Sequence, residues 1–218
     1  MTLKLYSYWR SSASYRVRIA LALKNLEYQY VPVNIVKDGG EQHRAEYRAL
    51  NPQARVPLLV DGDFALAQSL AILEYLEARF PAPALVPADA RERARMWAFC
   101  HTIAADIQPL QNTGPLGYLA RELGVGEEQR NAWIRHWVER GLGALEQELR
   151  GRPETRFALS DTPTLADCVL LPQIYNAERF ACDSMKYPRL LAVAQRCRAL
   201  PEFARAAPEQ QPDANLRP

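Results

Sequence analysis

The first 26 residues combine positive charge with hydroxyl groups in a pattern that favours an anionic ligand. They contain no Asp or Glu, and their cationic side chains are Lys4, Arg10, Arg16, Arg18 and Lys24. Three of these cations surround a turn of sequence SSAS at residues 11–14. A helix that starts in such a turn directs free backbone amides and the positive end of its dipole at a ligand. Serines also cap helices that bind nothing, so the residue types alone leave both interpretations open.

Arg16 and Arg18 lie on the helix that is predicted to follow this turn. Their spacing of two residues separates them by about 200° around the helix axis, so they cannot share one solvent-exposed face. We expect at least one of them to have a buried partner or to lie at a domain interface. The alternative is that these arginines lie at a solvated rim of the domain.

The elements around the turn form a predicted α/β domain over residues 1–80. Residue alternation and helical spacing predict a strand at 3–8, a helix at 15–23, a second strand at 28–33 and an amphipathic segment at 41–50. The strand–helix–strand order implies that the two strands are parallel.

A hairpin and a further helix complete this domain. Asp61-Gly62 between two apolar runs predicts a hairpin, which adds two antiparallel strands. Ser69 precedes an apolar run at 70–76 and is expected to cap a helix there. The predicted order is therefore βαβαββα.

The rest of the chain reads as a linker and an all-α domain. Residues 81–89 contain three prolines, which suit a short stiff linker, and residues 90–218 show helical spacing. Helices are expected at residues 90–123, 127–149, 165–180 and 190–200. Thr164 and Asp167 have the spacing of a capping box, and Pro172 is expected to kink its helix. We expect the tail from residue 208 to lie over the surface or to fray.

Composition favours a small-molecule partner. The 27 Lys and Arg against 25 Asp and Glu give a net charge of +2, too weak a field to argue for nucleic acid or an anionic membrane. No apolar run is long enough to span a membrane or to act as a signal peptide, so we expect a cytoplasmic protein. The cysteines lack metal or redox spacing and are expected to be buried reduced thiols: Cys100, Cys168, Cys182 and Cys197. No metal is expected, and His43, His101 and His136 receive no role.

The sequence YSYWRSSASYRVRIAL at residues 6–21 resembles the signature of zeta-class glutathione transferases, the maleylacetoacetate isomerase family. Further blocks agree in order and spacing at residues 36–42, 51–57, 68–76, 107–112, 164–167, 172–180 and 211–213. The resemblance covers nearly the whole chain. It implies a thioredoxin-like first domain followed by a helical bundle, the glutathione transferase architecture.

The resemblance also implies which residues hold glutathione. They are Ser11, Ser12, Ala13, Ser14, Tyr15, Arg16, Gln42, the backbone of Val56, Gln68 and Ser69, with Gln108 and Asn112 approaching from the helical domain. The family raises the expectation that the Val56–Pro57 bond is cis, although only about 5 to 6% of such bonds are. Ser69 at a helix N-terminus suits the γ-glutamyl carboxylate, and plain capping is compatible with that role.

The chemistry implied requires the thiol of glutathione to be ionised. Such a thiol has a pKa of about 8.5, and lowering it by about two units takes roughly 2.7 kcal/mol. A hydroxyl donating to a charged acceptor contributes about 1.5 to 3 kcal/mol, and a helix N-terminus about 0.3 to 1 kcal/mol more. By resemblance Ser11 is the expected donor, with Ser12 as the alternate. Ala13 occupies a place where the family often carries Cys, so no thiol of the protein is available in the turn.

The implied reaction is isomerisation of maleylacetoacetate to fumarylacetoacetate. The glutathione thiolate adds to the cis double bond, the bond rotates, and elimination regenerates glutathione. Arg10, which we also place in the catalytic turn, and Arg179 are expected to bind the carboxylates of the keto acid, because a guanidinium suits bidentate carboxylate recognition. The alternatives for these arginines are a solvated turn residue and an ordinary charge at a helix end.

Other functions remain open at this point. Maleylpyruvate isomerase performs the same chemistry on a shorter acid, and Thr113-Gly114 in place of an arginine favours the longer substrate. A general glutathione transferase is a third enzyme, and a noncatalytic binding module of the same fold is a hypothesis of another class. The family implies a homodimer.

Overall fold

The computed structural model describes residues 3–214, which form two compact units. The first unit is Met1–Ala84 with Ala199–Pro218, and the second is Leu85–Arg198. Residues 199–218 are predicted from the sequence to belong to the helical domain, whereas the structure groups the described part of this range, residues 199–214, with the first unit. Helix α9 (Pro201–Ala206) packs against α1 (Ser12–Leu23) and buries Phe203 and Ala206. Helical spacing shows that such a segment has an apolar face but does not show which unit covers it.

The first unit contains the predicted βαβαββα order around a mixed sheet. Its strands are β1 (Leu3–Ser7), β2 (Tyr28–Pro32), β3 (Leu58–Asp61) and β4 (Phe64–Ala67), in the spatial order β2-β1-β3-β4. Strands β1 and β2 are parallel, and β1–β3 and β3–β4 are antiparallel. The expected parallel pair and the hairpin at Asp61-Gly62 are both confirmed.

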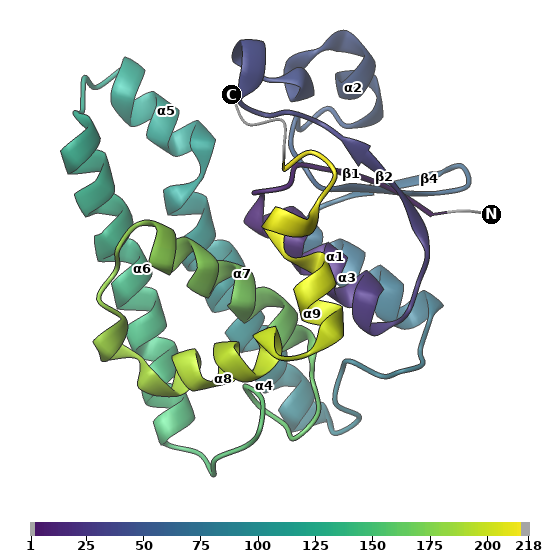
Figure 1. Cartoon of the computed structure of the whole chain (residues 1–218), viewed down its shortest axis with the longest axis vertical. Coiled ribbons are helices and arrows are strands. Elements are labelled where there is room, and N and C mark those ends of the chain that lie inside the picture. The colour runs from purple at the N-terminus through teal and green to yellow at the C-terminus, as the bar shows by residue number, and fades with distance from the viewer. Residues whose placement is uncertain (1–2, 215–218) are drawn as a thin grey trace. The chain divides into compact units, whose positions relative to one another are not determined.

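Helices cover both faces of this sheet. Helix α1 and α3 (Ser69–Arg79) pack against each other on one side, and the short α2 (Ala45–Leu50) lies on the other (Figure 1). The amphipathic segment predicted at 41–50 is helical only from Ala45, because residues Glu41–His43 form a separate 3₁₀ turn. In Figure 1 the yellow α9 runs beside the purple α1, so the returning chain lies on the helix that begins in the SSAS turn.

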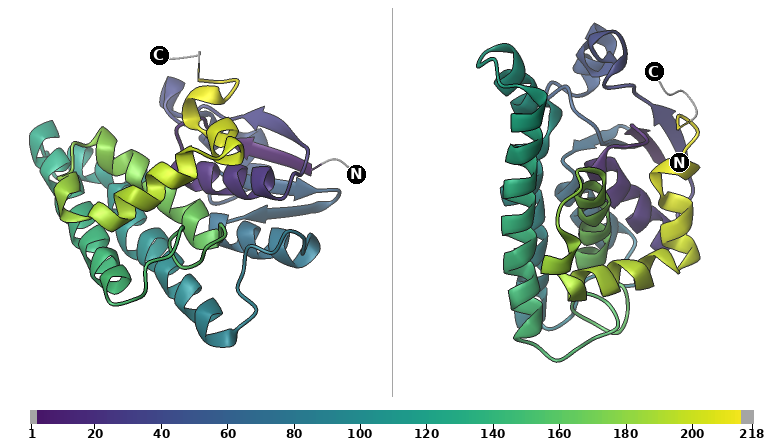
Figure 2. Two further views of the ribbon diagram at one scale, coloured as in Figure 1. Left: turned by 60° about the horizontal axis from the view of Figure 1, so that its bottom comes forward. Right: turned by 60° about the vertical axis from the view of Figure 1, so that its left-hand side comes forward.

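The second unit is helical in its described elements. Its helices are α4 (Ala90–His101), α5 (Thr113–Arg121), α6 (Glu127–Arg150), α7 (Leu165–Arg179) and α8 (Pro188–Arg198), and α6 is the long helix seen end to end in Figure 2. Helix α7 is buried along most of its length and packs against α4, α6 and α8.

One predicted helix is divided into several elements. The sequence suggested a single helix at 90–123, but a π-helical turn (Thr102–Ile107) and a 3₁₀ turn (Gln108–Gln111) separate α4 from α5. Pro109 has no amide hydrogen to continue an α-helix, and Asn112 caps α5 by accepting a hydrogen bond from the Thr113 amide at 2.8 Å.

Asp167 fixes the start of α7 as the capping box predicted. Its carboxylate accepts from the amide and hydroxyl of Thr164 at 2.8 and 3.1 Å. It also accepts from the amide of Ala158 at 2.8 Å, so it ties the preceding loop to the helix. Burial raises the pKa of Asp167 to about 6, although these hydrogen bonds act in the opposite direction.

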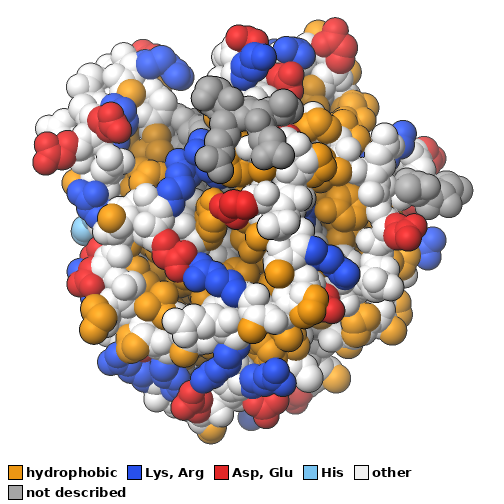
Figure 3. All heavy atoms as spheres, in the orientation of Figure 1, with side chains coloured by type: hydrophobic (Ala, Val, Ile, Leu, Met, Phe, Trp, Pro, Cys, Tyr) orange, Lys and Arg blue, Asp and Glu red, His pale blue; other side chains and the backbone are white. Residues whose placement is uncertain are grey.

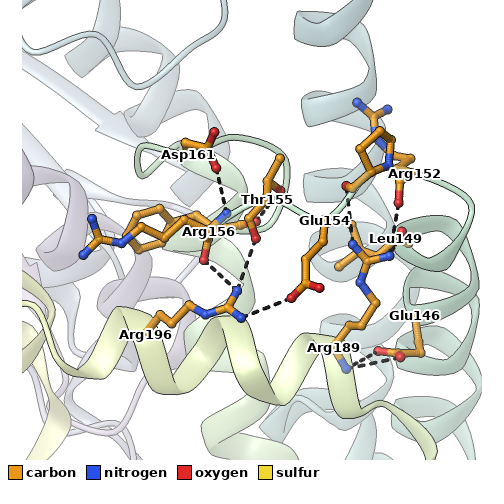
Figure 4. Close-up of polar contacts among 11 residues, drawn as sticks. Glu146, Leu149, Arg152, Glu154, Thr155, Arg156, Asp161, Arg189 and Arg196 are labelled. Carbon is orange, nitrogen blue, oxygen red and sulfur yellow. Dashed lines mark hydrogen bonds and ion pairs between the residues drawn. The ribbon is translucent and has the colours of Figure 1, made fainter.

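Two arginines of α8 hold the loop that joins α6 to α7 (Figure 4). Arg196 donates to the carbonyls of Thr155 and Arg156 at 3.2 and 3.1 Å. Arg189 donates to the carbonyl of Arg152 at 3.3 Å and to that of Leu149 in the last turn of α6. The buried carboxylate of Glu146 accepts from the Arg189 amide at the first turn of α8. The arginines of α8 therefore anchor this loop through its backbone carbonyls. Such contacts do not depend on the side chains of the loop, so its sequence does not reveal them.

Acidic and basic side chains are interspersed on the face drawn in Figure 3, in keeping with the small net charge. Within residues 3–214 no helix has the length and apolar character needed to cross a membrane, and no cluster of His, Cys, Asp or Glu could hold a metal ion. The expected buried thiols are confirmed, because all four cysteines are free and buried.

Candidate active site

The SSAS turn places Ser11 at the N-cap of α1. Its backbone is extended, with φ −70° and ψ 118°, and its hydroxyl oxygen accepts from the Ser14 amide at 3.2 Å. A hydroxyl has two lone pairs and one hydrogen, so capping uses a lone pair and leaves the hydrogen free to donate. The two interpretations left open by the sequence are therefore compatible in one side chain.

Accessibility separates the residues of the turn into two groups. Arg10, Ser11, Ser12 and Ala13 are partly exposed, whereas Ser14, Tyr15 and Arg16 are buried. The guanidinium carbon of Arg10 lies over the Trp9 ring, 5.2 Å from its centroid, and no carboxylate of residues 3–214 forms an ion pair with it. The side chains of the first group are therefore the more accessible to a ligand.

Arg16 joins this turn to the start of α3. Its guanidinium donates to the Ser69 hydroxyl at 3.1 Å, and both side chains are buried. Neither α1 nor α3 carries an acidic residue in its first turn. Two helix N-termini and a buried guanidinium thus lie together in the first unit, and each of these features favours an anion.

The structure corrects the expected cap of α3. Gln68, not Ser69, occupies the N-cap position, and Ser69 is the first helical residue. Gln68 has φ +74°, a backbone conformation that non-glycine residues rarely adopt and that clusters at functional sites. Its side-chain amide donates to Gln53 at 2.6 Å. The Ser69 hydroxyl, which accepts from Arg16, forms no cap.

The loop before β3 contains the expected cis bond at Val56–Pro57. Val56 lies outside the strand ladder, which begins at Leu58. The Arg55 carbonyl accepts from the Tyr47 hydroxyl at 2.6 Å and from the Asn51 amide group at 2.8 Å, and these bonds fix the loop. Burial raises the pKa of Tyr47 to about 12, so its hydroxyl stays protonated and able to donate.

Gln42 presents a buried acceptor in the first unit. The side chain is buried, and its Nε2 donates to the Ile35 carbonyl at 3.4 Å, while Oε1 has no partner among the described residues. Gly40 makes this position possible. It has φ +100°, and a Cβ there would lie 2.4 to 2.7 Å from the Gln42 amide atoms.

The three candidates of the second unit lie in two places within it. Gln108 begins the 3₁₀ turn and Asn112 follows its last residue, Gln111, which donates to the buried Gln173 of α7 at 2.7 Å. Arg179 is exposed in the last turn of α7, with its guanidinium 4.7 Å from the centroid of the Phe180 ring.

Arg18 is the main residue whose role the sequence left undefined. It is 1% exposed and donates to the Ser7 hydroxyl and to the carbonyls of Tyr8, Trp9 and Ala206, at 2.9 to 3.4 Å. Burial lowers its pKa. The expected buried partner for Arg16 or Arg18 is confirmed for both.

Asp213 and Tyr30 were not singled out as site residues. Asp213 accepts from the Trp9 amide at 3.0 Å and from the Tyr30 hydroxyl at 2.6 Å. The block at residues 211–213 was a visible signal, but only the fold shows that it returns to the turn.

Comparisons with known proteins identify one family. Residues 1–78 match the family model described as "Glutathione S-transferase, N-terminal domain", and residues 127–196 match the corresponding C-terminal domain. A probable maleylacetoacetate isomerase of Vibrio cholerae is 50% identical over 98% of this chain and 99% of its own. A solved maleylpyruvate isomerase, described as a bacterial glutathione S-transferase in the zeta class, is 45% identical, with a TM-score of 0.94 over 96% of this chain and 99% of its own.

A third relative was solved with ligands. The maleylacetoacetate isomerase of Anaeromyxobacter dehalogenans, 42% identical, has a TM-score of 0.87 over 100% of this chain and 97% of its own. It holds dicarboxyethyl glutathione and citrate in its active site. The chain described above therefore belongs to the glutathione S-transferase family and, within it, to the zeta class.

Proposed function

We propose that this protein is a glutathione-dependent cis–trans isomerase that converts maleylacetoacetate to fumarylacetoacetate. The observation that carries the proposal is the Ser11 hydroxyl at the N-cap of α1, whose hydrogen is not used by the cap. This partly exposed donor lies at a helix N-terminus that favours negative charge. Those are the properties that stabilise a thiolate.

The described residues offer hydrogen-bonding groups and positive charge that suit the functional groups of glutathione. The tripeptide carries a thiol, two carboxylates, an ammonium group and two peptide bonds. We propose that Ser11, with Ser12 as the alternate, holds the thiolate, and that the α3 N-terminus at Gln68 and Ser69 holds a carboxylate. The unpartnered Oε1 of Gln42 offers an acceptor for an N–H group, and the backbone of Val56 is free of the strand ladder.

When bound, glutathione supplies a thiolate that adds to the cis double bond and is eliminated after the bond has rotated. The protein's task is to keep that thiol ionised and to orient the acid. Ser11 contributes about 1.5 to 3 kcal/mol toward ionisation and the helix end about 0.3 to 1 kcal/mol, which together match a pKa decrease of about two units. Ala13 supplies no thiol, and none is needed for this chemistry.

Arg10 is proposed to bind a carboxylate of the substrate. Its guanidinium is partly exposed beside Ser11 in the sequence and has no ion-pair partner in residues 3–214, so its charge is available. The ligands of the A. dehalogenans relative, a dicarboxyethyl group and citrate, show that a zeta-class site accepts carboxylates. Arg179, Gln108 and Asn112 keep the roles that the resemblance gave them as predictions for the second unit.

Maleylpyruvate is the second candidate substrate. The relative with a TM-score of 0.94 is a maleylpyruvate isomerase, and both acids carry the same cis double bond beside a carbonyl. Thr113-Gly114 follows Asn112, at a place where the family resemblance implies an added arginine in some of the enzymes for the shorter acid. This absence favours maleylacetoacetate.

The test is to follow the absorbance of each acid with and without glutathione. We expect glutathione-dependent conversion of maleylacetoacetate, with a larger kcat/KM than for maleylpyruvate. Conversion of neither acid in the presence of glutathione would refute the isomerase. A protein that binds glutathione tightly but turns over neither acid would be the noncatalytic module.

We propose in addition that the enzyme acts as a homodimer, as the family resemblance implies, and in the cytoplasm, as predicted from the sequence. Sedimentation or light scattering over a range of protein concentrations tests the assembly, and a single species of monomer mass would contradict it.

A further inference from the structure

The last described residues of the chain bind the segment that leads into the SSAS turn. Asp213 is 6% exposed, and its two carboxylate oxygens accept from the Trp9 amide at 3.0 Å and from the Tyr30 hydroxyl at 2.6 Å. The Trp9 contact joins residues 204 positions apart in the sequence. A buried carboxylate with two donors defines both the position and the orientation of the groups that it binds.

The other side of Trp9 is held by Arg18. Its Nη2 donates to the Trp9 carbonyl at 2.9 Å, and its Nε donates to the Ala206 carbonyl at 3.0 Å. The amide and the carbonyl of Trp9 are therefore both fixed, one by Asp213 and one by Arg18. The Trp9 carbonyl belongs to the peptide bond that leads into Arg10, so this clamp sets how the chain enters the turn.

Apolar packing reinforces the same clamp. Ala214 is 4% exposed and packs in a cluster with Tyr8 and Trp9, and the partly buried Ile35 and Val56 pack against that cluster. The Ile35 carbonyl accepts from Gln42, and Val56 precedes the cis proline. The cluster that includes Ala214 thus contacts Val56, to which we assign glutathione, and Ile35, which holds the Gln42 side chain.

The returning segment is itself closed by side-chain hydrogen bonds. Gln211 is buried, and its Nε2 donates to the carbonyls of Arg205 and Ala207 at 3.1 and 2.8 Å. These bonds fold residues 206–214, which we call the C-terminal segment, back on the end of α9.

We propose that Asp213 is a positioning residue for the thiolate site, and that the C-terminal segment acts through Trp9 to hold Ser11 and Arg10 in place. The step from clamp to site is short, because the Ser11 amide donates to the Tyr8 carbonyl at 3.0 Å. Arg18 contacts that same carbonyl at 3.4 Å. This inference rests on the proposed role of Ser11.

A tail that only stabilised the fold would need no buried charge. Burying a carboxylate and a guanidinium costs free energy, and apolar side chains of similar volume often stabilise as well or better. Polar contacts restrict geometry, and a displacement of about 1 Å in a site can cost about 100-fold in rate. The buried charges of Asp213 and Arg18 therefore fit a role in positioning Trp9.

The test compares Asp213→Asn with Tyr30→Phe and with Glu209→Gln. Asparagine has one acceptor oxygen in place of two and no charge, so neither donor keeps a charged acceptor, and the Asn nitrogen either faces the Trp9 amide or reverses the bond to the Tyr30 hydroxyl. Tyr30→Phe removes the hydroxyl bond and leaves the Trp9 bond. Glu209→Gln removes the same charge from an exposed side chain of the same segment and serves as the control.

The first measurement is hydrogen exchange of residues 9–15 in the ligand-free proteins. We expect faster exchange of the Trp9 and Ser11 amides in Asp213→Asn, a smaller change in Tyr30→Phe and none in Glu209→Gln. Unchanged exchange in Asp213→Asn overturns the inference, and this result does not depend on whether glutathione binds.

The second measurement is the pH dependence of thiolate absorbance when glutathione is added. We expect Asp213→Asn to shift its midpoint upward and to lower kcat/KM about tenfold, short of the ~100-fold limit for a 1 Å displacement. A lower melting temperature with wild-type thiolate titration and kcat/KM would show a merely structural role and overturn the inference. Absence of a thiolate signal in the wild type would instead refute the proposed function.

Discussion

Replacement of Ser11 by alanine tests both functions that the structure assigns to one hydroxyl. The cap bond from the Ser14 amide, at 3.2 Å, is lost, and loss of such a cap costs about 1 kcal/mol of folding stability. The donated hydrogen bond to the thiolate is lost as well, which costs about 1.5 to 3 kcal/mol of transition-state stabilisation. We therefore expect kcat/KM to fall about 10- to 150-fold and the pKa of the bound thiol to rise by about one to two units.

The control for the cap is Asp89→Ala. Asp89 caps α4 in the second unit, where its carboxylate accepts from the Arg91 and Glu92 amides at 3.0 Å. Its loss should also lower stability by about 1 kcal/mol. We expect the two variants to have similar melting temperatures and only Ser11→Ala to change the thiolate titration.

The assay combines urea unfolding, the pH dependence of thiolate absorbance and steady-state kinetics. Wild-type thiolate titration in Ser11→Ala would refute the assignment of the donor to Ser11. If Ser12→Ala shows the expected loss instead, Ser12 is the donor and the cap and the donor are different residues.

Three further predictions concern the substrate, the Gln42 position and the start of α7. Arg10→Lys should raise KM for the acid about tenfold or more, because lysine lacks the bidentate fork, and should leave the dissociation constant of glutathione unchanged; a wild-type KM would contradict the role of Arg10. Gly40→Ala should weaken glutathione binding because its Cβ displaces Gln42, whereas Gly39→Ala, with φ +79° and open space around the Cβ, should cost stability alone; equal affinities in the two variants would exclude a contact through Gln42. Burial raises the pKa of Asp167 from 3.8 to about 6, so the folded state binds this proton more tightly than the unfolded state does. As the pH rises from about 4 to about 6, the free energy of unfolding should therefore fall by up to about 1.4 kcal/mol per pH unit. Asp167→Asn should lack this component in urea titrations, and identical slopes in both proteins would contradict the burial effect.

Local patterns predicted the elements that local interactions determine. Alternation, helical spacing and Asp61-Gly62 predicted the βαβαββα order, and the spacing of Thr164 and Asp167 predicted their capping box. The angle between Arg16 and Arg18 predicted a buried partner or an interface position for at least one of them, because a helix cannot expose both sides, and both prove to be buried.

Features that depend on distant contacts could not be predicted in the same way. Residues 199–218 have helical spacing, but only the packing of α9 on α1 shows that they belong with the first unit. Ser69 precedes an apolar run and resembles a cap, but its hydroxyl accepts from Arg16 and the chain begins the helix one residue earlier than expected.

The same limit applies to the site. The resemblance identified Ser11, Gln42 and Gln68 as candidates, while the structure shows that Ser11 caps α1 as an acceptor, which leaves its hydroxyl hydrogen to donate. The clamp of Trp9 by Arg18 and Asp213 combines two ends of the chain, and neither end alone suggests it.

The stoichiometry of glutathione tests the central claim most directly. Maleylacetoacetate is supplied in large excess over glutathione, and both fumarylacetoacetate and free thiol are measured as the reaction proceeds. An isomerase that regenerates glutathione converts all of the acid while the free thiol remains constant. Conversion that stops after one equivalent of thiol has been consumed, or that proceeds equally well without glutathione, would contradict the proposed function.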